Sequence, residues 1–299
     1  MTLIFGTRPS VLARWQTAHM MQLLQAAWPG LECLEQIITT SADRLVDRPL
    51  PEIGEKGFFT SELETALLCG DVHVAVHSLK DLPVGNRQGL VIAAIPARDS
   101  ALDALVAPKR ETLASLPEGA RLGTGSIRRA AQLLARRPDL TILPLRGNVD
   151  TRLRKVLDGE YDAIVLAAAG LTRLRLESHI TETLPLAWML PAPGQGALAV
   201  QCRADDEETV RLLVAIHDPL THAAVSAERA FLSGLGAGCS LPIGAFAEKN
   251  NGQLILTGAV ISEDGKQSIR LSAAGEEPQE LGERLAQLVL ERGAVDLLA

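Results

Sequence analysis

The sequence predicts an α/β protein with two similar α/β domains and a small α+β domain at the C-terminus. Apolar strands alternate with helices over the first two thirds of the chain. A Gly-Thr turn with a nearby Ser follows a strand twice, at 6–10 and at 123–126. The tail instead has closely spaced strands joined by Asn-Gly and Asp-Gly turns, which are typical of hairpins. A length of 299 residues suffices for two or three domains, each with its own core.

The first domain starts with a short buried strand, residues 3–5, that enters the first Gly-Thr turn. Ser10 is a suitable N-cap for a helix over 11–28, which Pro29-Gly30 ends. The elements expected next are a strand over 34–40, a loop over 41–57, a helix behind a Ser61/Glu64 capping box that ends near Gly70, and strands over 72–79, 89–95 and 103–107.

The pattern then starts again at Leu122, which indicates a second, similar domain. The elements expected there are a helix over 127–136, a strand over 140–145, a helix over 149–157 and a strand over 163–168. A Pro/Gly segment over 191–196 indicates a hinge, and a strand over 197–202 follows it. Because the chain leaves one domain, builds another and returns, we expect two lobes with a cleft between them.

Helices are predicted over 207–217 and 223–235. The tail after them is expected to form an α+β domain, with strands over 244–248, 254–261 and 268–273 and a helix over 280–292. The expected domain ranges are 1–96 with 197–214, then 102–190, then 219–299.

The composition excludes some classes of function. A net charge of −7 argues against non-specific nucleic-acid binding, and 3% aromatic residues argue against base-stacking surfaces. No apolar run reaches the length of a membrane span and the N-terminus does not resemble a secretory signal, so we expect a cytoplasmic protein. The four cysteines, Cys33, Cys69, Cys202 and Cys239, are too scattered for a zinc site or disulfide framework.

Arginines recur beside Gly, Ser and Thr where strands should lead into helices. The segments are 6–10, 123–129 and 145–152. Guanidinium groups next to exposed backbone N–H groups suit carboxylates or phosphates. In an acidic chain, this pattern favours a site for a small multivalent anion.

Two further segments are candidates for chemistry, and each has a structural alternative. Asp81 follows a buried strand, where a carboxylate can act as acid or base, but the same sequence fits a charged turn ended by Pro83. Cys239 lies in a glycine-rich loop and fits a nucleophile or covalent anchor; it also fits a small residue in a tight turn. We expect the other three cysteines to lie in the core.

Taken together, these segments resemble the porphobilinogen deaminase family, also called hydroxymethylbilane synthase, nearly from end to end. The segments that carry the resemblance, in order, are GTRPSVLARWQT (6–17), GEKGFFTSELETALL (54–68), VHSLKDLP (76–83), GTGSIRRAAQL (123–133), LRGNVDTRL (145–153), DAIVLAAAGLTRL (162–174), LPAPGQGALAVQCR (190–203) and AERAFLSGLGAGCSLPIGA (227–245). The resemblance implies two periplasmic-binding-protein-like (type II) α/β domains plus an α+β cofactor domain. It also implies the small molecule porphobilinogen as the partner, without a metal. From the sequence itself we expect no nucleic-acid or membrane partner, and a monomer by default, because nothing in it demands an interface.

The resemblance also implies the reaction and its residues. Four porphobilinogens are joined head to tail with loss of ammonia on a dipyrromethane cofactor, and water releases hydroxymethylbilane. Cys239 matches the thioether attachment site and Asp81 the catalytic carboxylate. The other cofactor-binding matches are Lys80, Thr124, Ser126, Arg128, Arg129 and Arg146. The substrate-binding matches are Arg8, Ser10, Lys56, Arg146, Arg152, Arg173 and Gln195.

Some positions depart from the family pattern, and other functions remain open. Glu52 and Ser61 stand where lysine is frequent, which weakens the case for several basic contacts from 41–57. Gly236-Ala237-Gly238 replaces a more usual sequence before the cysteine. The alternatives are a non-catalytic organic-anion-binding protein of the same two-lobed fold, and a ligand-sensing regulatory module.

Overall fold

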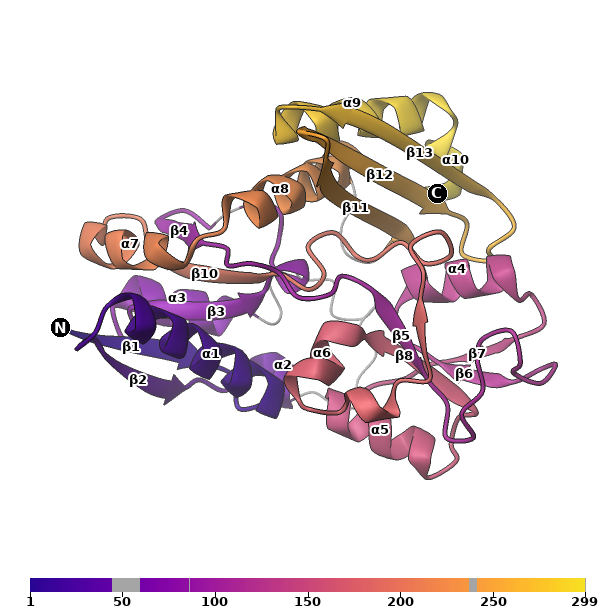
Figure 1. The fold of residues 1–299 in the computed structure, drawn as a ribbon, viewed down its shortest axis with the longest axis horizontal. Coiled ribbons are helices and arrows are strands. Elements are labelled where there is room, and N and C mark those ends of the chain that lie inside the picture. The colour runs from indigo at the N-terminus through magenta and orange to yellow at the C-terminus, as the bar shows by residue number, and fades with distance from the viewer. Residues whose placement is uncertain (45–59, 86, 237–240, 299) are drawn as a thin grey trace. The chain divides into compact units, whose positions relative to one another are not determined.

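The computed structural model describes residues 1–44, 60–85, 87–236 and 241–298 (Figure 1). The chain divides into two compact units. Unit 1 comprises 1–98 and 197–222, and unit 2 comprises 99–196 and 223–299. The C-terminal sheet therefore groups with the second α/β sheet.

Unit 1 is built on a five-stranded mixed sheet in the order β2-β1-β3-β10-β4. Its strands are β1 (Thr2–Thr7), β2 (Glu32–Ile37), β3 (Val74–Ser78), β4 (Leu90–Ala94) and β10 (Leu198–Arg203). Its helices are α1 (Val11–Ala27), α2 (Ser41–Arg44), α3 (Ser61–Cys69), η2 (Leu79–Asp81), α7 (Glu207–Leu213) and η4 (Val214–Ile216). Apolar residues of α1 and α7 pack on one face of the sheet, and those of α3 pack on the other.

Unit 2 has a second five-stranded mixed sheet, in the order β7-β6-β8-β5-β9. Its strands are β5 (Asp103–Val106), β6 (Arg121–Gly123), β7 (Thr141–Leu143), β8 (Ala163–Ala167) and β9 (Glu182–Leu184). Its helices are α4 (Ile127–Arg136), α5 (Val149–Leu157), α6 (Ala168–Arg173) and η3 (Glu177–His179). Leu133 of α4 packs on one face of the sheet, and residues of α5 and α6 pack on the other.

The C-terminal part of unit 2 is a three-stranded antiparallel sheet. It consists of β11 (Ile243–Asn250), β12 (Gln253–Ile261) and β13 (Ser268–Gly275), with α9 (Pro278–Glu291), α10 (Ala294–Leu298) and α8 (Pro219–Gly234), whose first turn belongs to unit 1. Figure 1 shows α9 along this sheet, where its Leu281 and Leu285 are buried. Ala259 and Ile261 of β12 pack against Ala131 of α4. The C-terminal sheet thus supports the helix that carries Arg128 and Arg129.

The two α/β sheets share one topology, which confirms the repeat predicted from the two Gly-Thr turns. In unit 1, β1 lies between β2 and β3 and runs parallel to both. In unit 2, β6 lies in the same way between β7 and β8. An antiparallel strand then separates β3 or β8 from the edge strand of its sheet, β10 in unit 1 and β5 in unit 2. These two strands follow the connections between the units, so each strand belongs to the unit that the chain has just entered.

Most predicted elements are confirmed within a few residues, and three expectations are wrong. The capping box fails because Thr60, not Ser61, is the N-cap of α3, so Ser61 is already helical and its hydroxyl donates to Glu62. The three remaining cysteines are not all in the core, because Cys69 is exposed at the end of α3 and Cys33 is half-buried. The loop expected over 41–57 begins with the short helix α2. The sequence reading also did not include β9, α6 or α10.

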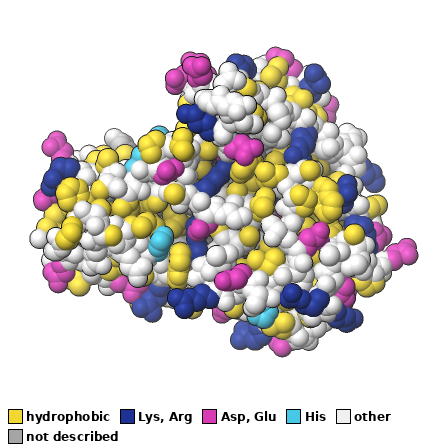
Figure 2. Space-filling model, viewed as in Figure 1, with side chains coloured by type: hydrophobic (Ala, Val, Ile, Leu, Met, Phe, Trp, Pro, Cys, Tyr) yellow, Lys and Arg dark blue, Asp and Glu magenta, His cyan; other side chains and the backbone are white. Residues whose placement is uncertain are grey.

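The charged surface is mixed in sign. Figure 2 shows Lys and Arg side chains interspersed with Asp and Glu over the face that is drawn. Among the described residues, no helix is long and apolar enough to cross a membrane.

Candidate functional site

In unit 1, Arg8 and Ser10 follow β1, while Lys80 and Asp81 follow the neighbouring parallel strand β3. Carboxyl ends of parallel strands meet at one edge of a sheet, which is where ligands of α/β proteins bind. The side chain of Ser10 accepts a hydrogen bond from the Ala13 N–H and so caps α1.

Arg8 already has an internal carboxylate partner. Its Nη2 lies 2.5 Å from Oδ1 of Asp43, and its Nε donates to Oδ2 at 3.3 Å. Partial burial raises the pKa of Asp43, but hydrogen bonds from Arg8 and Thr40 outweigh this effect and hold the pKa below its usual value. A ligand carboxylate at Arg8 would therefore share the guanidinium with Asp43.

Asp81 is the last residue of η2, the short helix directly after β3, and its side chain is exposed. The backbone holds this turn in place, because the Leu79 N–H donates to the Ala197 carbonyl at 3.0 Å. Lys80, beside it, is half-buried. The turn presents a carboxylate to solvent at the ligand-binding edge of the sheet.

A buried polar row lies behind this turn. His77 of β3 is 5% exposed, and its Nε2 lies 3.2 Å from Oε1 of Gln201 on β10. The Gln201 amide in turn donates to Glu64 of α3. Burial lowers the pKa of His77 to about 4, so the imidazole is neutral near pH 7 and donates its Nε2 proton to Gln201.

In unit 2, the second Gly-Thr turn forms the start of α4. The Thr124 Oγ1 accepts the Ser126 N–H at 3.2 Å, and the Ser126 Oγ accepts the Arg129 N–H at 3.4 Å as the helix N-cap. Gly125 is required here because a Cβ would lie 2.8 Å from the Leu145 carbonyl oxygen. The predicted anion-binding residues Thr124 and Ser126 thus hold the first turn of α4 in place.

Arg128 and Arg129, in that first turn, are each only 5% exposed and share one fully buried carboxylate, Asp103 of β5. Arg128 Nη1 donates to Oδ2 at 2.8 Å. Arg129 donates to Oδ1 through Nε at 3.1 Å and through Nη2 at 2.8 Å. Burial alone would raise the pKa of Asp103, but the two guanidinium charges lower it far below its usual range. The cluster therefore carries one net positive charge in the interior.

Gln195 and Leu190 connect this cluster to the rest of unit 2. Gln195 is 1% exposed, and its amide donates to Oδ1 of Asp103 at 2.9 Å and to the Ala101 carbonyl at 2.7 Å. The Leu190 carbonyl accepts from Arg128 Nη1 at 2.5 Å. Gly244 of β11 packs so closely on Leu190 that a Cβ there would lie 2.7 Å from the Leu190 Cβ. The arginine cluster is therefore tied to the strand that begins shortly after Cys239 in the sequence.

The remaining predicted arginines also have internal partners. Arg173, at the end of α6, donates to Asp99 through Nε at 2.8 Å and to the Gly196 carbonyl through Nη2 at 2.7 Å. Arg152 Nε donates to the Gly147 carbonyl at 2.7 Å. Arg146 is half-buried just before α5.

Lys56 and Cys239 lie outside the described residues, so the structure says nothing of them. Sequence reasoning missed Asp103, the acceptor shared by three of the predicted residues. The signal was present: Asp103 is the single charged residue in the apolar run 101–107. A lone acid in such a strand indicates a buried partner of opposite charge.

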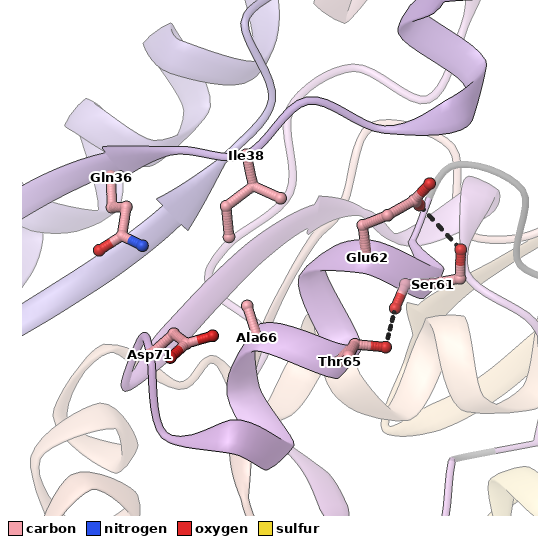
Figure 3. A pocket seen from close by; sticks show the side chains of 7 residues that line it. All are labelled: Gln36, Ile38, Ser61, Glu62, Thr65, Ala66 and Asp71. Atoms are coloured by element: carbon pink, nitrogen blue, oxygen red, sulfur yellow. Dashed lines mark hydrogen bonds between the residues drawn. The ribbon is translucent and has the colours of Figure 1, made fainter.

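A pocket of about 400 Å³ in unit 1 does not fit the predicted ligand. Figure 3 shows it between the end of β2 and α3. The side chains that line it are Gln36, Ile38, Ser61, Glu62, Thr65, Ala66 and Asp71. This lining includes two acids and no base, which repels carboxylates.

The structure defines an α/β protein with two mixed sheets of the same topology, an antiparallel C-terminal sheet, and two buried arginines after the second Gly-Thr turn. Comparison with known families identifies the family. The family described as "Porphobilinogen deaminase, dipyromethane cofactor binding domain" matches residues 3–211, and "Porphobilinogen deaminase, C-terminal domain" matches residues 222–291. The chain belongs to the porphobilinogen deaminase family and has that family's activity in tetrapyrrole biosynthesis, with a domain for the dipyrromethane cofactor.

Full-length relatives support this conclusion. Porphobilinogen deaminase of Roseiflexus castenholzii is 50% identical over 299 residues, which cover 100% of this chain and 99% of the relative. Those of Brevibacillus brevis and Deinococcus radiodurans are 48% and 47% identical, over 98% and 99% of this chain and 96% and 98% of theirs.

Among solved structures, the chain is similar to the VFT2 domain of Bordetella pertussis BvgS, with a TM-score of 0.43 and 18% identity over 77% of this chain and 92% of that one. It is also similar to an arginine-specific periplasmic binding protein of Salmonella typhimurium, with a TM-score of 0.39 and 14% identity over 74% of this chain and 93% of that one.

Proposed function

We propose that the chain joins four porphobilinogen molecules head to tail, with loss of one ammonia from each, on a dipyrromethane held by Cys239 through a thioether. Water then releases hydroxymethylbilane. When bound, the dipyrromethane supplies the pyrrole carbon to which the first substrate is joined. The observation that supports this assignment best is the buried Arg128–Asp103–Arg129 cluster, since its net positive charge suits a ligand that carries carboxylates.

The residues of unit 2 fit the chemistry of a dipyrromethane, on which each pyrrole carries two carboxylates. Arg128 is only 5% exposed, yet no acceptor among the described residues forms a hydrogen bond with its Nε or Nη2. These two nitrogens form the edge of a guanidinium that binds a carboxylate in a bidentate manner. We assign the cofactor carboxylates to Lys80, Thr124, Ser126, Arg128, Arg129 and Arg146.

The incoming substrate is assigned to a second group of residues. These are Arg8, Ser10, Lys56, Arg146, Arg152, Arg173 and Gln195. Because Arg8 and Arg173 hold Asp43 and Asp99, each of these arginines would give up part of an internal ion pair, or share it, when it binds a substrate carboxylate. Each charge-assisted hydrogen bond to a ligand carboxylate is worth about 1.5–3 kcal/mol, which offsets that loss.

Asp81 is the proposed catalytic residue. Loss of ammonia from the substrate requires a proton on the leaving nitrogen and leaves a positive charge on the pyrrole. The Asp81 carboxyl can deliver that proton, and its carboxylate then stabilises the cation. The turn after β3 holds Asp81 at the edge of the sheet where ligands bind.

Intact mass under denaturing conditions tests the covalent attachment. The freshly purified active protein should exceed its sequence mass by a two-pyrrole adduct, and Cys239→Ser should remove the adduct. Cys69→Ser is the matched control, because Cys69 is an exposed thiol and should leave the adduct in place. A wild-type protein at sequence mass that is nevertheless active would refute the assignment of Cys239.

Kinetics test the role of Asp81. Asp81→Ala should nearly abolish turnover while the melting temperature changes little, because Asp81 is exposed and contributes little to the core. Turnover close to that of the wild type would remove Asp81 from the catalytic role.

We also propose that the chain acts as a monomer in the cytoplasm. Light scattering coupled to size-exclusion chromatography tests the oligomeric state, and a mass near twice 31.9 kDa would contradict it.

A further inference from the structure

The repeated topology of the two sheets allows each position in unit 2 to be compared with its counterpart in unit 1. Ser126 and Ser10 are equivalent, since each caps the helix after the first strand and accepts from the N–H three residues later. Arg128 and Arg129 therefore correspond to Leu12 and Ala13.

Asp103 has an equally well-defined counterpart. It pairs with Ala167, the last residue of β8, just as Leu198 pairs with Ser78, the last residue of β3. Unit 1 thus has an apolar trio where unit 2 has two arginines and an aspartate. The sheet and its first helix form without the ions, so the fold itself does not require them.

Burying these charges is unfavourable unless each one is paired, and a well-packed apolar substitute is often as stable. Both oxygens of the acid are paired here. Two donors from Arg129 and one from Gln195 meet Oδ1 of Asp103, and one donor from Arg128 meets Oδ2. A buried carboxylate with four donors holds its partners in one geometry.

The two arginines differ in what remains available to a ligand. Arg129 uses Nε and Nη2 on Asp103, and Nη1 on the Val165 carbonyl at 3.2 Å. Arg128 is held through Nη1 alone, by Asp103, the Leu190 carbonyl and the Met189 sulfur. Its Nε and Nη2 have no acceptor among the described residues.

We propose that Asp103 is a positioning residue for the carboxylate site: it fixes Arg128 by one nitrogen, with Arg129 and Gln195 as its supports, and so leaves Nε and Nη2 of Arg128 to bind a ligand carboxylate. This inference rests on the proposed function, which assigns Arg128 to the cofactor. It adds a residue that neither contacts the ligand nor is required by the fold.

The test is Asp103→Asn in the full chain, which keeps the shape of the side chain and removes its charge. We expect the fraction of protein with the two-pyrrole adduct to fall at least fivefold. In the loaded fraction, KM for porphobilinogen should rise about tenfold with kcat within threefold, because Gln195, which is assigned to the substrate, loses its charged acceptor on Asp103. Adduct occupancy and KM within twofold of wild type would overturn the proposal.

If Asp103→Asn does not fold, Asp103→Glu replaces it, since it keeps the charge but displaces the carboxylate. Normal occupancy and KM in this variant would overturn the proposal equally. Failure of both variants to fold would show a structural requirement and would also overturn it. Asp162→Asn is the matched control: its carboxylate pairs with Arg121 at the surface of unit 2, and the variant should keep normal occupancy and KM.

Arg128→Gln separates this proposal from the proposed function. If Arg128→Gln loads and binds as wild type does, the carboxylate site on α4 is refuted, and the role of Asp103 is refuted with it. If Arg128→Gln is impaired and Asp103→Asn is normal, only the positioning role of Asp103 is refuted.

Discussion

Gly196→Ala is expected to destabilise unit 2 strongly, for a reason that Gly159→Ala can isolate. Both glycines have left-handed backbones, with φ of 86° and 82°. At Gly159 an added Cβ would meet nothing within 4 Å, whereas at Gly196 it would lie 2.5 Å from the Asp99 carbonyl oxygen and 2.8 Å from that of Ser100. The two substitutions therefore share the backbone cost and differ only in the steric conflict.

The expected magnitudes follow from these contacts. A non-glycine residue in a left-handed conformation costs about 1–2 kcal/mol, which is the whole effect expected for Gly159→Ala. The conflict at Gly196 is with backbone atoms that cannot rotate away, and overpacking of this kind costs about 1–3 kcal/mol more. Gly196→Ala should therefore lower the free energy of unfolding by about 2–5 kcal/mol.

The substitution should also affect substrate binding. The Gly196 carbonyl accepts hydrogen bonds from Arg173 and from the Asp99 N–H, so any shift of this residue displaces the Arg173 guanidinium. We expect KM for porphobilinogen to rise in Gly196→Ala and to stay unchanged in Gly159→Ala. Urea unfolding followed by circular dichroism, with steady-state kinetics, measures both effects. Equal destabilisation by the two substitutions would refute the steric argument.

Three further predictions concern ionisable groups in unit 1. The folded-state pKa of His77 lies near 4, below the ordinary 6.5, so the unfolded chain takes up a proton first as the pH falls. The free energy of unfolding should therefore fall by about 3 kcal/mol from pH 6.5 to pH 4. In urea unfolding, His77→Gln should reduce this dependence on pH. The folded-state pKa of Asp43 is also lowered, so its contribution is present above the ordinary 3.8 and is lost as the pH falls further; Asp43→Asn should therefore remove part of the acid sensitivity of the melting temperature below pH 4, and an unchanged profile would contradict this. Maleimide should label the exposed thiol of Cys69 in the active enzyme without loss of turnover. Inactivation by labelling at Cys69 would show that this thiol is itself needed for turnover.

The sequence predicted most of the fold because periodicity and helix caps are local. Ser10 and Ser126 start α1 and α4 as expected, and the Asn-Gly and Asp-Gly turns join the C-terminal strands as expected. The order of strands in the sheets was not predicted. The places of β5 and β10 depend on pairing with strands that are mostly far away in the sequence, and no local pattern records this.

The sequence predicted the positively charged residues of the candidate site, and the structure shows which aspartates pair with the arginines among them. Asp43, Asp99 and Asp103 hold Arg8, Arg173 and the pair on α4 respectively. None of these acids lies within 20 residues of its arginine, so sequence spacing could not pair them. The anion site stays a proposal, and four of its arginines already form ion pairs with aspartates of the chain.

The way each acid is held suggests how the arginines divide their roles. Asp99 is 45% exposed and Asp103 is fully buried, although both pair with an arginine at 2.8 Å. Water can replace the arginine at Asp99 at little cost, so Arg173 can transfer to a substrate carboxylate. Water does not reach Asp103, because its side chain is fully buried. Removing an arginine would leave the Asp103 carboxylate without that partner, which costs about 3–5 kcal/mol. Arg128 and Arg129 must therefore keep Asp103 while a ligand is bound, which suits a cofactor that stays in place, whereas Arg173 suits a substrate that arrives and moves on.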